Sequence, residues 1–136
     1  MILIIVVLTG TVAAIVTFHA SEKWNLGPVR ASAVLSLAVG LLFHFLDQHL
    51  QHALQGQIPL VFIGGSFVGM VSSKVMPRYG LVGLAGFFFS MLYLYAPSFF
   101  HGYGGALGTA ACTALVFVLG LQYLLRYVNI TVKKES

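Results

Sequence analysis

Residues 59–74 read PLVFIGGSFVGMVSSK, a stretch long and apolar enough to cross a bilayer as a helix. Small residues recur in it at positions that share one helix face: Gly65, Gly69, Ser72 and Ser73, with Ser66 beside them. Bulky apolar side chains, among them Leu60 and Phe67, occupy the other side. One thin side is typical of a helix that is approached closely, either by another helix or by a solute that passes along it.

The composition of the whole chain points to a membrane protein. The chain has 136 residues, of which 59% are hydrophobic and only 7% charged. A soluble domain of this size needs more charge to cover its surface. We therefore expect one transmembrane domain, residues 1–136, whose surroundings are the lipid bilayer. The net charge of +4 does not indicate a nucleic-acid partner, because the basic residues are scattered and form no patch.

The apolar stretches divide into five, and the four prolines lie where one stretch ends or the next begins. The fold class predicted is all-α, a polytopic integral membrane protein with five transmembrane helices that pack through small-residue faces. The expected spans are residues 2–18, 28–46, 58–76, 79–95 and 104–128. A polar turn at residues 19–27 separates the first two, and residues 129–136 are expected to be a short polar tail.

The basic residues predict the orientation of these spans. In the five-span arrangement all seven fall on one side of the membrane: Lys23, Arg30, Lys74, Arg78, Arg126, Lys133 and Lys134. Basic residues mark the cytoplasmic side, so the N-terminus is expected outside and the C-terminus in the cytoplasm. The sequence thus predicts a multi-pass protein of the cell (plasma) membrane.

Small residues also recur on the other helices, and the fifth opens with a glycine-rich segment that contains Gly104, Gly105 and Gly108. Lipid supplies no hydrophobic drive between helices, so close backbone packing must hold them together. The thin faces therefore predict a tight bundle. Small-residue faces that are not used inside the bundle would contact a second copy of the chain, giving a homo-oligomer, or a partner membrane protein.

One polar cluster could bind a transition metal on the outer side. Its members are His44, Asp47, His49 and His52, with His101 in the other outer loop. Imidazole and carboxylate groups are ligands of zinc and copper. Their spacing matches no metal signature, since a helical pair normally uses i and i+4. We favour hydrated interfacial side chains without a cofactor and keep the metal as the alternative.

Catalysis and ion coupling find no support in the sequence. The three acidic residues are Glu22, Asp47 and Glu135, and none lies deep in an expected span. A transporter driven by a buried carboxylate is therefore disfavoured. The deep serines have no histidine at their level, so the chain is not expected to be an enzyme. Cys112 lies among small residues and is expected to be a packing residue.

Two functions remain. The first is a small channel, carrier or transport subunit for a small solute, in which the Gly/Ser face of residues 65–73 lines the path. The alternative is a non-catalytic membrane subunit or scaffold that packs against partner membrane proteins. For the Gly/Ser face itself, helix packing is the interpretation we favour over a solute path.

The charge pattern makes a prediction about topology. A fluorescent reporter fused to the C-terminus should be bright, because fusion to a cytoplasmic end lets it fold, and a phosphatase reporter fused there should be inactive. A phosphatase that is active at the C-terminus would contradict the five-span arrangement.

Overall fold

The computed structural model describes residues 1–46, 52–96 and 105–135. This part of the chain is entirely α-helical apart from its turns, which confirms the all-α prediction. Its helices are α1 (Ile2–Lys23), α2 (Pro28–Phe45), α3 (His52–Val68), α4 (Tyr79–Tyr95) and α6 (Ala106–Glu135).

Three of the helices are long and apolar enough to cross a membrane: α1, α2 and α6. The apolar parts of the other two are shorter, Gly56–Val68 in α3 and Tyr79–Tyr95 in α4. At about 1.5 Å per residue, α4 is roughly 25 Å long, slightly less than a hydrocarbon core of about 30 Å. The structure thus supports a helical membrane protein, while the number of spans and their orientation stay predictions.

The third helix differs from the expected span, residues 58–76, at both ends. α3 begins earlier, at His52, and ends at Val68, so Pro59 lies inside the helix. At the C-terminal end the N–H groups of Met70 and Val71 each bond a carbonyl three residues back, at 3.3 Å, which tightens and closes the last turn. An apolar run shows where a helix can form, but these closing hydrogen bonds decide where it stops.

The first and last helices are longer than expected, whereas α2 and α4 match the expected stretches to within one residue. α1 continues through the polar residues 19–23. The expected polar tail is helical as far as Glu135, so α6 has 30 residues. No glycine or proline follows Gly120, and nothing in that segment breaks the helix. Polarity alone does not end a helix.

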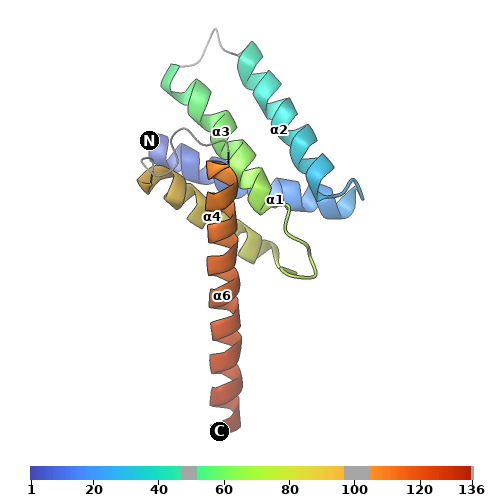
Figure 1. Cartoon of the computed structure of the whole chain (residues 1–136), viewed down its shortest axis with the longest axis vertical. Helices are drawn as coiled ribbons and strands as arrows, with labels where there is room; N and C mark the ends of the chain where they lie inside the picture. Colours follow the sequence, from blue (N-terminus) through green and yellow to red (C-terminus); the bar gives the residue numbers. More distant parts are fainter. Residues whose placement is uncertain (47–51, 97–104, 136) are drawn as a thin grey trace.

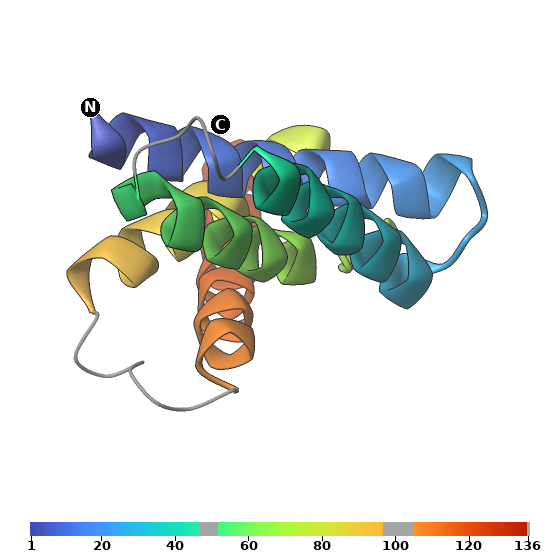
Figure 2. The same cartoon turned by 90° about the horizontal axis from the view of Figure 1, so that it is seen from above.

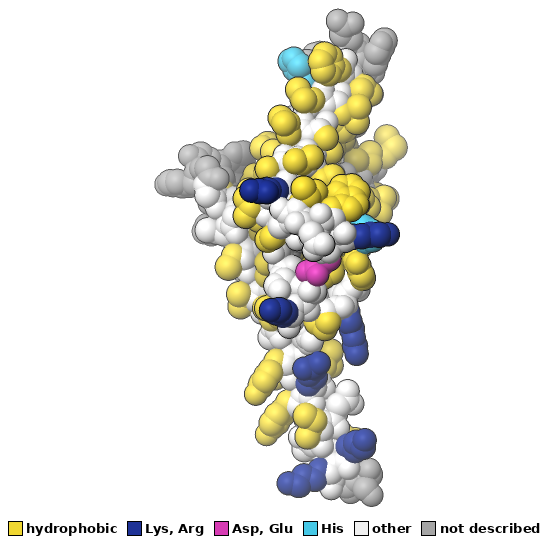
Figure 3. Space-filling view, turned by 90° about the vertical axis from the view of Figure 1, so that its right-hand side faces the viewer, with side chains coloured by type: hydrophobic (Ala, Val, Ile, Leu, Met, Phe, Trp, Pro, Cys, Tyr) yellow, Lys and Arg dark blue, Asp and Glu magenta, His cyan; other side chains and the backbone are white. Residues whose placement is uncertain are grey.

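α1 is the centre of the fold, in contact with α2, α3 and α4 (Figure 1). α2 and α3 lie side by side, and seen from above α6 runs across the other helices rather than along them (Figure 2). The N-terminal part of α6 packs against α3 and α4, and its C-terminal half projects beyond them. The Lys and Arg side chains lie along the middle and lower part of the molecule, and a histidine side chain lies near the upper end (Figure 3).

Glycines let α3 and α4 approach the backbone of α1 from two sides. A Cβ atom added at Gly65 of α3 would lie 2.7 Å from the carbonyl oxygen of Gly10. A Cβ atom added at Gly86 of α4 would lie 2.9 Å from the same oxygen. Both distances are shorter than a van der Waals contact, so only glycine fits at either position. Gly10 itself lies against the hydroxyl of Ser90.

The rest of the core fills the space around this junction. Phe89 of α4 has no exposed surface, and its ring lies against Gly64 of α3. The other fully buried side chains include Val6, Val61 and Val118, which come from α1, α3 and α6. A large ring against a bare backbone is the close packing that membrane helices need, because lipid offers no other drive for their association.

The junction predicts which glycines tolerate a methyl group. Gly65→Ala should lower the free energy of unfolding by about 1–3 kcal/mol, because the added methyl overpacks a backbone contact. Gly40→Ala on α2 is the matched control, since a Cβ atom there meets nothing within 4 Å. Both variants gain the same helix propensity. Melting in detergent should therefore show a lower Tm for Gly65→Ala alone, and equal Tm values would contradict the packing.

Candidate functional site

A cluster of three serine hydroxyls joins α2 to α3. Ser66 of α3 has no exposed surface, and Ser32 of α2 is 3% exposed. The Oγ atom of Ser66 lies 2.7 Å from the Oγ atom of Ser32 and 3.2 Å from that of Ser36. Ser32 and Ser36 follow each other at i and i+4, so both hydroxyls face α3. The three residues form the buried polar contact between these two helices.

The hydrogen bonds of Ser66 use its full capacity. Its hydroxyl donates to the carbonyl oxygen of Ile63 at 2.6 Å. A hydroxyl has one proton to donate and two lone pairs to accept with. The hydroxyls of Ser32 and Ser36 must therefore donate to Ser66, which fills both lone pairs. Ser66 is left with nothing to offer a passing solute, whereas Ser36 is only half-buried and keeps its own lone pairs.

The predicted small face of α3, together with the adjacent Gly64, is divided among three neighbouring helices. Gly64 lies against Phe89 of α4, and Ser66 bonds to α2. Gly65 packs on Gly10 of α1, and Gly69, directly after α3, lies against the carbonyl oxygen of Ala14. Each small residue that the sequence singled out in this helix therefore accommodates a neighbour within the chain.

Ser72 and Ser73 do not continue that face, because α3 has ended before them. The backbone N–H of Ser73 donates to the carboxylate of Glu22 at 3.2 Å, which ties this turn to the end of α1. The hydroxyl of Ser72 accepts the N–H of Lys74 at 3.3 Å. The prediction of one continuous stripe from Gly65 to Ser73 is therefore wrong for its last two members. Both serines lie in the turn that follows α3, next to Lys74.

The glycines at the start of α6 differ from those of α3, because no neighbouring atom of the described residues lies close to them. A Cβ atom added at Gly105 or Gly108 would meet no atom within 4 Å. Gly104 lies outside the described residues. Cys112 on the same helix is exposed, so its expected packing role is not fulfilled inside the described chain. Gly105, Gly108 and Cys112 therefore lie off the packed face of α6, whereas the alanines of the same segment, Ala106, Ala110, Ala111 and Ala114, are buried.

The histidine cluster falls mostly outside the described residues. His44 is exposed near the end of α2. Asp47, His49 and His101 lie in segments that the structure leaves undescribed, and His52 is the first residue of α3, without a described side chain. Within the described ranges, no three His, Cys, Asp or Glu side chains come together as a metal site would require. The metal site stays a prediction.

Sequence reasoning missed a groove between the start of α4 and the C-terminal half of α6. Arg78 lines it from the α4 side, and Gln122, Arg126 and Asn129 line it from α6. The three α6 residues are spaced at i, i+4 and i+7, so they share one helix face. That spacing was the available signal. The expected spans do not reveal it, because they place Asn129 in a tail and Arg78 in a loop.

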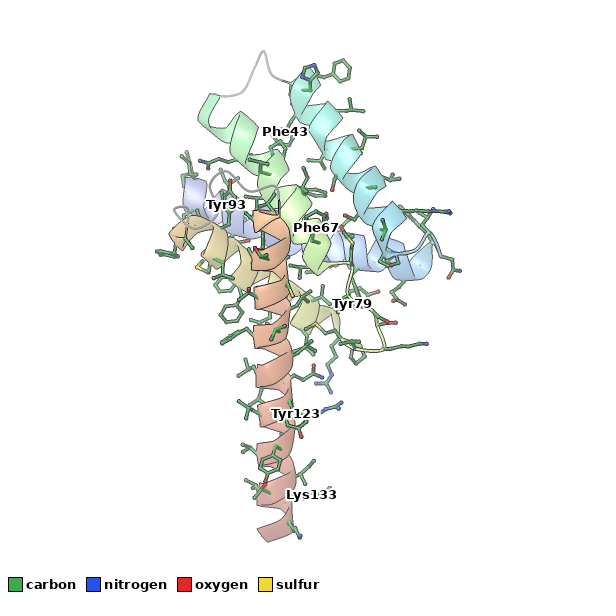
Figure 4. The ribbon with its side chains drawn as sticks, viewed as in Figure 1. Phe43, Phe67, Tyr79, Tyr93, Tyr123 and Lys133 are labelled. Atoms are coloured by element: carbon green, nitrogen blue, oxygen red, sulfur yellow. The ribbon has the colours of Figure 1, made fainter. Side chains whose placement is uncertain are left out.

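The start of α4 is also fastened to the end of α1. The Nδ1 atom of His19 lies 3.2 Å from the hydroxyl oxygen of Tyr79, and the rings of Phe18 and Tyr79 stack edge to face with centroids 5.2 Å apart. Figure 4 shows Tyr79 at this corner of the fold, with Tyr123 and Lys133 on the projecting half of α6. These contacts hold Arg78, the residue before Tyr79, at one end of the groove.

The serine cluster predicts an energetic coupling between α2 and α3. In a double-mutant cycle of Ser32→Ala and Ser66→Ala, we expect a coupling of about 0.6 kcal/mol and at most about 1.7 kcal/mol, the range for hydrogen bonds between membrane helices. The control cycle pairs Ser32→Ala with Ser90→Ala, because the Ser90 hydroxyl donates to Gly86 of its own helix. Equal couplings in the two cycles would contradict the cluster.

Comparison of the chain with protein-family models, with curated proteins and with solved structures finds no match. Any function proposed for the chain therefore rests on its own residues. The strongest of these observations are the glycine contacts of α1, the saturated hydroxyl of Ser66 and the projecting half of α6.

Proposed function

We propose that the chain is a multi-pass protein of the plasma membrane that acts as a non-catalytic subunit, packing through α6 against a partner membrane protein or a second copy. The observation that carries this proposal is how the small residues are used. Gly65, Ser66 and Gly69 each contact another helix of the same chain. These contacts support packing as the role of α3 and leave α6 as the element directed outward.

The C-terminal half of α6 supports an outward role. Its apolar side chains are between 55% and 72% exposed and follow one another around the helix: Tyr123, Leu124, Leu125, Tyr127, Val128, Ile130 and Val132. This half of the helix projects beyond the other four (Figure 1). Apolar side chains on several sides of a helix indicate surroundings of lipid or protein. Tyrosine is a residue type enriched both at membrane interfaces and at protein contacts.

One observation favours the second candidate, a transport function. Ser36 is half-buried and lies beside Ser66. One turn further along α2, a Cβ atom added at Gly40 would meet no atom within 4 Å. Within α2 only Ala31 and Ser32 are buried. A hydroxyl and a bare glycine on an open helix face could replace water around a small solute. A transport path would therefore run along α2 and not along the small face of α3.

Photo-crosslinking tests the subunit proposal in native membranes. We expect a photoreactive amino acid in place of Tyr127 on α6 to form an adduct of one defined larger mass, because a partner helix lies against it. The control position is Leu41 on α2, which is 49% exposed. Only lipid adducts should form there. Lipid adducts alone at both positions would contradict the proposal.

Flux measurements in liposomes separate the two candidates. The subunit proposal predicts that the purified chain conducts none of a panel of small ions and neutral solutes. Flux that falls in Ser36→Ala at unchanged Tm would instead establish transport along α2. Thr113→Val is the control, because the exposed hydroxyl of Thr113 donates only to Thr109 of its own helix.

A further inference from the structure

The groove between α4 and α6 has a polar end. Arg78 and Arg126 line it together with Gln122 and Asn129, so two guanidinium groups and two side-chain amides belong to its lining residues. Among the described residues, no carboxylate lines it. Guanidinium groups bind phosphate oxygens through paired hydrogen bonds, and the two amides add neutral donors. The polar end therefore suits an anion that carries several oxygens.

The other wall of the groove is apolar. Leu81 and Leu84 of α4 face Val118 and Leu121 of α6, and Val118 is fully buried. The groove holds a volume of about 330 Å³, within the range of about 300–1,000 Å³ of ligand sites. A hydrated inorganic phosphate gains nothing from leucine side chains. A molecule with a phosphate at one end and a hydrocarbon chain at the other uses both walls.

The Lys and Arg side chains occupy the middle and lower part of the molecule (Figure 3), and two of them, Arg78 and Arg126, line the groove. Arg78 directly precedes α4, and Arg126 lies in the last third of α6, so both belong to the helix ends that the charge pattern places toward the cytoplasm. Basic pockets between helices on that side of a membrane bind anionic lipid headgroups. Position, charge and shape thus agree on one kind of occupant.

We propose that this groove binds an anionic phospholipid, with the phosphodiester on Arg78 and Arg126 and an acyl chain along Leu81, Leu84 and Leu121. The lipid fills the angle between α4 and the part of α6 that leaves the bundle, and so sets how α6 projects. This inference rests on the proposed membrane location. It does not depend on a protein partner, so it can fail or hold independently of the subunit proposal.

Native mass spectrometry of the full chain in neutral detergent tests the site. Phosphatidylglycerol should remain bound at one molecule per chain, and phosphatidylcholine should not. The variant Arg78→Gln with Arg126→Gln should weaken phosphatidylglycerol binding by at least tenfold, because it removes two charge-assisted contacts. The control Lys23→Gln with Arg30→Gln removes the same charge from exposed positions outside the groove and should bind as the wild type does.

Several outcomes would overturn the proposal. Equal weakening in the two double variants would show general attraction of charge and no site. Equal retention of phosphatidylglycerol and phosphatidylcholine would show that the arginines do not select the headgroup. Competition by inorganic phosphate as strong as by the lipid would assign the groove to a free anion. The substituted arginines are exposed and should leave folding unchanged, which the Tm of each variant verifies.

Discussion

The fold depends on one contact, the approach of two helices to the carbonyl oxygen of Gly10. α3 reaches it with Gly65 and α4 with Gly86, and in neither case is there room for a Cβ atom. In a bilayer the helices gain no hydrophobic free energy from association, so dispersion contacts between closely spaced backbones must hold them. α1 is therefore held between α3 and α4, and the remaining elements are arranged around these three.

This arrangement also determines which neighbouring helix the buried serine hydroxyl faces. With α1 against Gly65, the adjacent position Ser66 is turned toward α2, where it accepts from Ser32 and Ser36. A buried hydroxyl without partners would be costly in an apolar environment, and here all of its capacity is used. The helices left least engaged are α2 and the far half of α6. Function is therefore proposed on those surfaces and in the groove where α6 leaves α4.

The sequence predicted the class of fold and the identity of the contact residues better than the ends of the helices. Apolar stretches and prolines located α2 and α4 to within one residue, and the small face correctly marked Gly65 and Gly69 as sites of close approach. The stop after Val68 and the helical tail of α6 depend on hydrogen bonds that hydropathy does not encode. The groove could not be predicted, because Arg78 and Arg126 are far apart in the chain and line one groove only through the packing of α4 against α6.

The central claim is that α1 is held between glycines of α3 and α4, and nuclear Overhauser effects test it most directly. In detergent micelles, methyl-labelled alanine should give one contact from the Ala13 methyl to the α-protons of Gly65 and another from the Ala14 methyl to those of Gly86. A Cβ atom added at Gly65 would lie 3.0 Å from the methyl carbon of Ala13, and one added at Gly86 would lie 2.9 Å from that of Ala14. The glycine α-protons therefore lie close to these methyl groups, and both signals should be strong. A folded helical chain in which both signals are missing would contradict the account.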